Sequence, residues 1–493
     1  MTKPAFDPEK SIEELLNLES EEAQPNAETI GEKPGASAKK TSDFNFDTKP
    51  EELESFLNQY VVGQEETIEV IATKVCTHFN RMKIENAIPS KERIVGNIKS
   101  NMLLIGPTGV GKTYIVKLIA KKIGVPFVKA DATKFSETGY VGGDVEDLVR
   151  ELVHESDGDI KKAEYGIIYL DEIDKIASSG NIYGPDVSRT GVQRNLLKLM
   201  EEAEVDLKTP HDLASQVEAA MEAQRTGKVT RQKINTRNIL FIVSGAFSGL
   251  DDIINRRLNK QSIGFDKVKI TGEDRQAILK KVKTEDLIQF GFESEFVGRL
   301  PVYVVLNDLD QEGLYKILKN KHSTVVMGKK MDFKAYGIDL SFSDEALKVL
   351  AMKANNEKTG ARGLLSVFER VLIKFEKSLP STNINKLVVD KQVVENPGAV
   401  LKEMLIEDGI HSFQKDFLVE HGIYLDFDND AVEKIQEMAG AKLKSIKQLC
   451  NELFRDYYHG LRLMKLENFT IRKEAVDDPD RFLNAFIKEN YHK

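Results

Sequence analysis

The segment Asn101–Thr113, NMLLIGPTGVGKT, decides the fold of this chain. An apolar run, Met102–Ile105, stops at Gly106, and a glycine-rich loop then leads into a second apolar-periodic segment, Tyr114–Ile123. This order predicts a strand, a phosphate-binding loop and a helix. An ordinary glycine-rich turn is the alternative, and the strand before the loop and the helix after it make that interpretation the weaker one.

Glycines shape the loop. Gly106, Gly109 and Gly111 let backbone N–H groups turn toward one point, where the start of the following helix adds a partial positive charge. Lys112 is placed to reach the β- and γ-phosphates of a nucleotide, and the Thr113 hydroxyl to bind magnesium. The sequence therefore predicts that the chain binds a nucleoside triphosphate with magnesium. The residues assigned to the nucleotide here are Gly106, Pro107, Thr108, Gly109, Val110, Gly111, Lys112, Thr113 and Tyr114.

Composition sets wider limits. The 493 residues are enough for two to four domains, and the net charge of −9 argues against nucleic acid as the main partner. No apolar run approaches the roughly 18 residues of a membrane helix. The first residues carry no apolar signal core, so we expect a cytoplasmic protein without a membrane anchor. The two cysteines, Cys76 and Cys450, exclude a four-cysteine zinc site and are expected to be buried free thiols.

Three further apolar segments read as strands. They are Pro126–Ala130, Ile167–Leu170 and Ile239–Val243, and the last two each end at a polar side chain. Strands that alternate with helices in this way predict an α/β fold with a parallel sheet, whose site lies at the carboxyl ends of the strands.

The acidic pair Asp171–Glu172 follows the second of these strands. Asp171 is placed to organise the magnesium shell, and Glu172 to polarise a water for attack on the γ-phosphate. A solvated loop entrance is the alternative for such a pair. Ser244, at the end of the neighbouring strand, is either a simple cap or a sensor of the γ-phosphate.

Seven motifs occur in one order along the chain. They are GPTGVGKT, ADATKFSETGYVGGDVEDLV (130–149), GIIYLDEIDKIA, DVSRTGVQ (186–193), ILFIVSGAFSGLD, EFVGRLP (295–301) and KTGARGL (358–364). Together they resemble the ClpX family of AAA+ protein unfoldases, with HslU as a near relative. The resemblance covers about residues 51–400. It implies an AAA+ P-loop NTPase domain with a smaller domain, a homo-hexameric ring that hydrolyses ATP with magnesium, and threading of polypeptides through a central pore.

The resemblance also assigns roles at the nucleotide. Arg299 matches the arginine finger, which projects into the neighbouring subunit's site, and a guanidinium fits that task because it is always charged and offers a planar fork of donors. Arg362 matches the arginine by which the small domain reaches the nucleotide. Val61 and Val62 are assigned to the nucleotide on the same ground. Taken alone, either arginine is more typical of a surface ion pair.

Substrate and partner contacts follow from the same resemblance. Tyr140 and Val141 match the first pore loop, where an aromatic between glycines grips a polypeptide, and Asp186–Gln193 resembles the second pore loop. Ile263, Gly264 and Phe265 match the tripeptide that docks the ring onto the ClpP peptidase. Surface loops are the alternative for the pore segments, and a strand start packed on its own domain is the alternative for the tripeptide.

The chain departs from the family pattern at both ends and in one insert. Residues 1–45 predict a disordered acidic tail in place of the family's zinc-binding domain, and Glu201–Asn238 forms an insert. Tyr336–Leu347 recurs 85 residues later as His421–Val432, with Lys447 at the position of Arg362. We therefore predict a large domain at 46–315, a small domain at 316–402, and a degenerate copy of the small domain at 403–493 that has lost nucleotide contact.

The sequence thus predicts a ring-forming ATPase that unfolds proteins and feeds them to a ClpP-like peptidase. Its expected substrates are tagged or already unfolded proteins. Two alternatives stay open: a remodelling ATPase that works without a peptidase, and an assembly scaffold switched by nucleotide.

Overall fold

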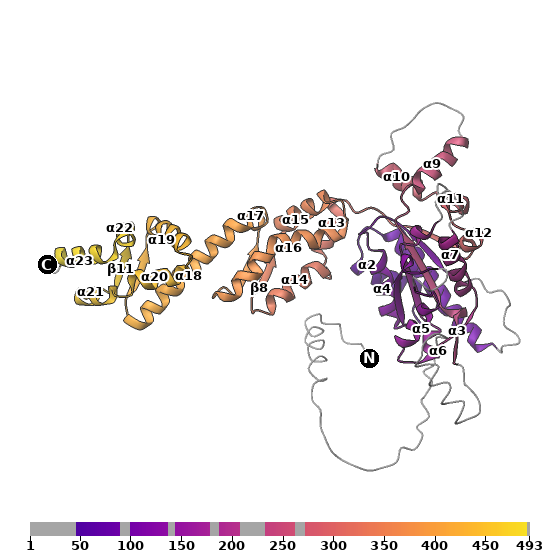
Figure 1. Cartoon of the computed structure of the whole chain (residues 1–493), viewed down its shortest axis with the longest axis horizontal. Coiled ribbons are helices and arrows are strands. Elements are labelled where there is room, and N and C mark those ends of the chain that lie inside the picture. The colour runs from indigo at the N-terminus through magenta and orange to yellow at the C-terminus, as the bar shows by residue number, and fades with distance from the viewer. Residues whose placement is uncertain are drawn as a thin grey trace, which may run out of the picture. The chain divides into compact units, whose positions relative to one another are not determined.

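The computed structural model describes residues 46–88, 99–136, 143–177, 187–207, 232–261 and 272–490. Its first part is built on a parallel sheet, whose strands run from purple to salmon in Figure 1. The strand order is β2-β3-β6-β1-β7, and every pairing is parallel. The strands are β1 (Met102–Ile105), β2 (Phe127–Asp131), β3 (Ile167–Asp171), β6 (Leu240–Gly245) and β7 (Val302–Val305). The predicted α/β class is confirmed.

Alternation of side chains gives the sheet two buried faces. Leu103 and Ile105 of β1 face one hydrophobic core, whereas Met102 and Leu104 face another. One core receives the helices α2 (Pro50–Tyr60), α3 (Glu65–Ala87) and α4 (Lys112–Ile123). The other receives α5 (Asp147–His154), α7 (Val187–Met200), α9 (Leu250–Gln261), α11 (Thr284–Phe290) and α12 (Ser294–Gly298). Burial on both faces explains why the strands read as continuous apolar runs.

Shorter elements complete this part. They are the helices α6 (Ile160–Ala163) and α10 (Gly272–Leu279), the 3-10 turns Ala132–Lys134, Ile173–Ile176 and Thr236–Asn238, and the strands β4 (Glu204–Asp206) and β5 (Lys233–Asn235). β4 and β5 form an antiparallel ribbon inside the insert. Residues 208–231 of the insert lie outside the described residues.

In the segment predicted as the second pore loop, Asp186–Gln193, the described residues are helical and do not form a loop, and the pore role of the segment stays a prediction. Residues 187–193 form the first two turns of α7. Val192, Leu196 and Leu199 are buried at helical spacing, and the buried Gln193 amide donates to the carbonyl of Ile176 at 2.8 Å. These contacts fix the segment as a packed helix.

A second part has its own core, which runs from Leu314 to Leu401. It contains α13 (Gln311–Lys319), α14 (Thr324–Lys334), β8 (Asp339–Phe342), α15 (Asp344–Asn356), α16 (Ala361–Ser378), the 3-10 turn Leu379–Ser381, β9 (Lys386–Val389) and α17 (Lys391–Glu395). β8 and β9 pair in parallel. The second part is therefore a helical unit around a two-stranded sheet.

The last part repeats this order of elements. It contains α18 (Pro397–His421), β10 (Tyr424–Phe427), α19 (Asn429–Lys442), α20 (Ile446–Phe454), α21 (Tyr457–Leu463), β11 (Asn468–Ile471), α22 (Lys473–Asp477) and α23 (Pro479–Asn490). β10 and β11 also pair in parallel, over a core that runs from Phe413 to Val476. In Figure 1, α19, α20 and α22 surround β11. The long helix α18 contributes to both cores and runs through the expected boundary at residue 402.

Both cysteines are buried free thiols, as predicted. Burial raises the pKa of Cys76 to about 11 and that of Cys450 to about 12. Neither thiol has the lowered pKa of a reactive cysteine. In the ranges that the structure describes, no helix combines the length and the apolar character needed to cross a membrane.

Candidate nucleotide site

The phosphate loop joins β1 to α4, as predicted. Gly109 and Gly111 adopt φ values of +85° and +98°, a region that favours glycine. α4 begins at Lys112, directly after this turn. The unpaired amides of its first turn therefore face the cavity beyond the strand ends, where an anion is favoured.

Lys112 is buried under the loop. Its Nζ donates to the carbonyls of Gly106 and Pro107, at 2.6 and 2.8 Å. Burial lowers the pKa of Lys112, and the carboxylates of Asp171 and Asp174 oppose that shift. The amine is therefore held at the base of the loop, where a phosphate can complete its hydrogen bonds.

Thr113, Asp171 and Ser244 converge as the sequence predicted, and a fourth residue joins them. Thr113 Oγ1 lies 3.3 Å from Asp171 Oδ2, and Ser244 Oγ donates to Asp171 Oδ1 at 2.7 Å. The buried hydroxyl of Tyr169 lies 2.6 Å from Ser244 Oγ and 3.2 Å from Thr113 Oγ1. Burial and the Asp171 charge raise the pKa of Tyr169 to about 12. This cluster of oxygen ligands suits magnesium, which prefers carboxylate and hydroxyl oxygens.

Glu172 stands at the cavity wall beside Asp171. Its φ of +57° is unusual for a residue with a side chain, and its backbone N–H donates to Asp171 Oδ1 at 3.1 Å. The next turn carries Asp174, which is buried and also lines the cavity. Among the described residues, Asp174 Oδ1 has no hydrogen-bond partner. The acidic end of the cavity is therefore lined by the carboxylate residues Asp171, Glu172 and Asp174.

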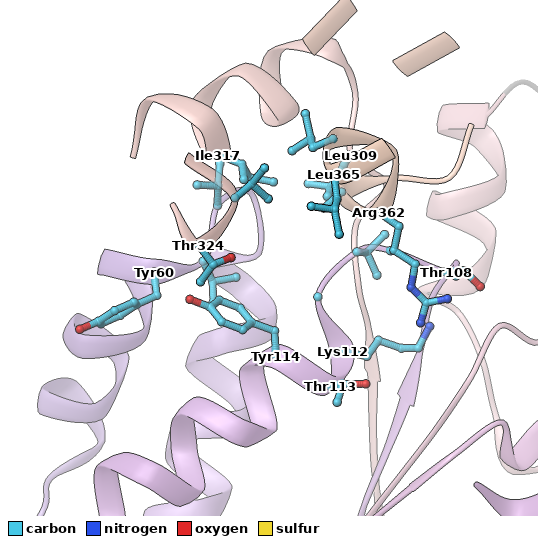
Figure 2. A pocket seen from close by; sticks show the side chains of 18 of the residues that line it. Tyr60, Thr108, Lys112, Thr113, Tyr114, Leu309, Ile317, Thr324, Arg362 and Leu365 are labelled. Carbon is cyan, nitrogen blue, oxygen red and sulfur yellow. The ribbon is translucent and has the colours of Figure 1, made fainter. Parts of the chain in front are cut away.

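A cavity of about 470 Å³ lies in front of these groups, between the sheet and the second part of the chain. Figure 2 shows Arg362 extending from α16 toward Lys112 and Thr113. Of the residues predicted at the nucleotide, those lining the cavity are Val61, Val62, Thr108, Gly109, Val110, Gly111, Lys112, Thr113, Tyr114, Asp171, Glu172 and Arg362. Gly106 and Pro107 stand behind them as acceptors for Lys112.

Part of the cavity wall is apolar. Val61, Val62, Leu309, Ile317 and Leu365 line it. Such a surface fits the flat face of a nucleobase, whereas the loop end fits the phosphates. The family resemblance predicted Val61 and Val62 as nucleotide-binding residues. It did not predict Leu309, Ile317 or Leu365, since no local pattern marks these three apolar residues as binding residues.

Buried polar contacts hold this side together. Gln64 is fully buried and exchanges two 2.8 Å hydrogen bonds with the backbone of Asn307. This pairing fixes the Val61–Val62 turn against the connection that leads to α13. On the other side, the Ala361 N–H donates to the Gly109 carbonyl at 2.9 Å. The phosphate loop is thus bonded directly to the start of α16.

Arg299 lies at the end of α12 and does not line the cavity. Its guanidinium is half exposed and forms an ion pair with Glu201. Of the other predicted residues, Tyr140 and Val141 of the pore loop and Ile263, Gly264 and Phe265 of the docking tripeptide lie outside the described residues.

Comparison with protein families agrees with this geometry. Residues 97–303 match the AAA domain of the Cdc48 subfamily, and residues 309–375 match the C-terminal, D2-small domain of ClpB protein. The parallel sheet, the phosphate loop and the cavity lined from both parts define an AAA-type P-loop ATPase.

Individual relatives are more specific. The ATP-dependent Clp protease ATP-binding subunit ClpX of Treponema denticola is 38% identical over 367 residues, covering 73% of this chain and 84% of that protein. Proteins of the same name from Borrelia duttonii and Borrelia recurrentis are each 41% identical over 367 residues, covering 73% of this chain and 81% of theirs. This chain belongs to the ClpX family.

Proposed function

We propose that this chain is an ATP-driven protein unfoldase that works as a homo-hexameric ring and delivers polypeptides to a ClpP-like peptidase. The observation that carries the proposal is the cavity shared by the phosphate loop and the start of α16. Arg362 lines the cavity that would hold the phosphates, and the Ala361 N–H is bonded to the phosphate loop. Loss of the γ-phosphate would therefore change contacts of α16 directly, and nucleotide turnover can move one part of the chain against the other. Membership of the ClpX family supports the use of that motion for unfolding.

Each residue has a role in the proposed reaction. The loop amides and Lys112 hold the triphosphate of ATP, and Thr113 and Asp171 hold magnesium. Bound magnesium neutralises charge on the phosphate oxygens. Glu172 accepts a proton from the attacking water, and Ser244 orients the Asp171 carboxylate through its 2.7 Å hydrogen bond.

Two arginines complete the proposed site. Arg362 reaches the phosphates from α16 of the same chain, in agreement with its direction in Figure 2. Arg299 stands outside its own cavity, half exposed, and is available to the site of a neighbouring subunit. A complete site then requires two subunits, which is why the activity is proposed for the ring.

Contacts with substrate and peptidase are proposed from the family resemblance alone. Tyr140 and Val141 would grip the polypeptide in the pore, and Ile263, Gly264 and Phe265 would dock on the peptidase. The substrate proteins would be tagged or already unfolded. The ring would work in the cytoplasm.

The test is ATP-dependent loss of fluorescence from a tagged, stably folded reporter protein, with and without the ClpP-type peptidase of the same organism. Degradation that requires the peptidase and is lost in Phe265→Ala supports the proposal. ATP hydrolysis without loss of reporter fluorescence under either condition would overturn it.

The additional repeat at residues 403–490 favours a second candidate, a remodelling ATPase without a peptidase. This part adds a further two-stranded unit beyond the cavity-lining one, and its Lys447 pairs with Asp416 at 2.7 Å instead of facing a nucleotide. Unfolding of the reporter that is equal with and without the peptidase, and unchanged in Phe265→Ala, would select this candidate.

A further inference from the structure

Tyr169 is a polar residue at the centre of an apolar strand. Its side chain is fully buried, and its ring stacks on Phe127 with centroids 6.5 Å apart. Tyr169 lies two residues before Asp171 on β3, and its partner Ile242 lies two residues before Ser244 on β6. Because strand side chains alternate, all four side chains share one face of the sheet, and that face carries the phosphate loop.

The hydrogen bonds around Tyr169 have one consistent direction. An ionised Asp171 only accepts, so the single hydroxyl hydrogen of Ser244 is used in the 2.7 Å bond to Asp171 Oδ1. In the 2.6 Å contact between Tyr169 and Ser244, Tyr169 is therefore the donor. Its hydroxyl oxygen is then left to accept from Thr113 Oγ1 at 3.2 Å. The chain of donors runs from Thr113 through Tyr169 and Ser244 to Asp171.

We propose that Tyr169 is a positioning residue for the metal site, because its hydroxyl directs the hydrogen of Thr113 away from the cavity and leaves the Thr113 lone pairs free for a divalent cation. This inference rests on the proposed ATPase site. Without the Tyr169 hydroxyl, the acceptor left for Thr113 among the described residues is Asp171 Oδ2 at 3.3 Å. That carboxylate oxygen would then be shared between Thr113 and the cation with its water shell.

The direct test is Tyr169→Phe, which removes one oxygen and keeps the ring. Binding of Mn²⁺ to the full chain in the presence of ADP is followed by electron paramagnetic resonance, and binding of a fluorescent ADP is measured in excess Mg²⁺ and in EDTA. We expect Mn²⁺ affinity to fall about tenfold. We also expect ADP affinity in EDTA to change less than about twofold, since the loop amides and Lys112 are untouched.

Tyr457→Phe is the matched control. Its hydroxyl is also lost from a buried ring, where it donates to the Pro479 carbonyl at 3.0 Å in the last part of the chain. This control should lower the unfolding temperature and leave Mn²⁺ affinity unchanged. A Tyr169→Phe protein that loses thermal stability but keeps wild-type Mn²⁺ affinity would overturn the inference, because the hydroxyl would then be structural only.

A second variant covers the case in which Tyr169→Phe does not fold. Ser244→Ala removes the acceptor of Tyr169 and should also weaken Mn²⁺ binding, and where both variants fold, their effects should be less than additive because they break one chain. Wild-type Mn²⁺ affinity in Ser244→Ala would contradict the inference. Failure of the proposed ATPase site itself would look different, since the wild-type chain would then bind no ADP even with Mg²⁺.

Discussion

Gly360 packs directly on Gly109: a Cβ built on Gly360 would stand 2.9 Å from the carbonyl carbon and oxygen of Gly109. Gly360 also adopts φ +60° and ψ −144°, a region that is essentially restricted to glycine. The pair brings the start of α16 against the phosphate loop with no side chain between them. The second part of the chain is therefore placed to follow the loop closely when a nucleotide binds.

Gly360→Ala should disturb this contact. Backbone strain costs roughly 1–3 kcal/mol, and α16 must move away from the loop to make room for the methyl group. We expect weaker ADP binding and a lower unfolding temperature, measured by fluorescence titration and calorimetry. Gly440→Ala is the matched control, because Gly440 lies in α19 with open space around it. The control should bind ADP normally; equal ADP affinity in both variants would contradict the role of the contact.

Glu172→Gln should separate binding from hydrolysis. The amide cannot accept the proton of the attacking water, so we expect the steady-state rate of ATP hydrolysis to fall at least about a hundredfold, with ATP affinity retained. Phosphate release and nucleotide titration measure the two quantities. Glu437→Gln, which changes an exposed carboxylate of α19 that pairs with Lys434, serves as the control. Wild-type turnover in Glu172→Gln would remove Glu172 from the reaction.

Arg299→Ala tests whether catalysis crosses a subunit boundary. The side chain is absent from its own cavity, so the variant should bind ATP normally while ATP hydrolysis falls more than about tenfold. Arg194→Ala is the control, because Arg194 is an exposed arginine in a comparable ion pair with Glu293. The control should hydrolyse ATP at the wild-type rate.

Mixing the two inactive variants gives the decisive result. In an equimolar ring of Glu172→Gln and Arg299→Ala subunits, about one site in four combines an intact Glu172 with a neighbour's intact Arg299. Partial recovery of ATP hydrolysis on mixing is therefore expected. A mixture as inactive as its components would mean that Arg299 acts within its own chain or not at all.

The sequence predicts the phosphate end of the site well, because local patterns encode it. The strand, the glycine turn and Lys112 follow within one short segment, and Asp171 is marked by the end of an apolar strand. The apolar part of the site, which fits the nucleobase, is formed by tertiary packing instead. Leu309 and Ile317 are ordinary apolar residues until α13 is brought against Val61, so no one-dimensional pattern distinguishes them from core residues.

Two errors have a physical explanation. Tyr169 reads as one more apolar strand residue, because the sequence does not show that its hydroxyl emerges beside Ser244 and Thr113. Residues 187–193 were predicted as a loop because the motif resemblance was given more weight than their periodicity. Val192 and Leu196 follow the spacing of a buried helical face, and that spacing agrees with α7.

His78 predicts a specific pH dependence of stability. The ring is buried on α3, and its Nε2 lies 3.0 Å from the Asn238 carbonyl, so Nε2 carries a hydrogen and donates it to this carbonyl. Burial, aided by the nearby Lys99 and Arg81 charges, lowers the pKa of His78 from 6.5 to about 4. In the unfolded chain His78 therefore takes up a proton near pH 6.5, whereas in the folded chain it stays neutral until the pH approaches 4. The folded state loses stability as the pH falls from 6.5 toward 4, by about 3 kcal/mol in full.

His78→Gln removes this titration and keeps a side-chain N–H donor for Asn238. Between about pH 7 and about pH 4.5, the unfolding free energy of the wild type should therefore fall more than that of the variant. His154→Gln, at an exposed position of α5, should track the wild type throughout. Parallel pH profiles for wild type and His78→Gln would mean that the buried ring accepts its proton without penalty. In that case the contact between α3 and the turn before β6 would not depend on the charge of His78.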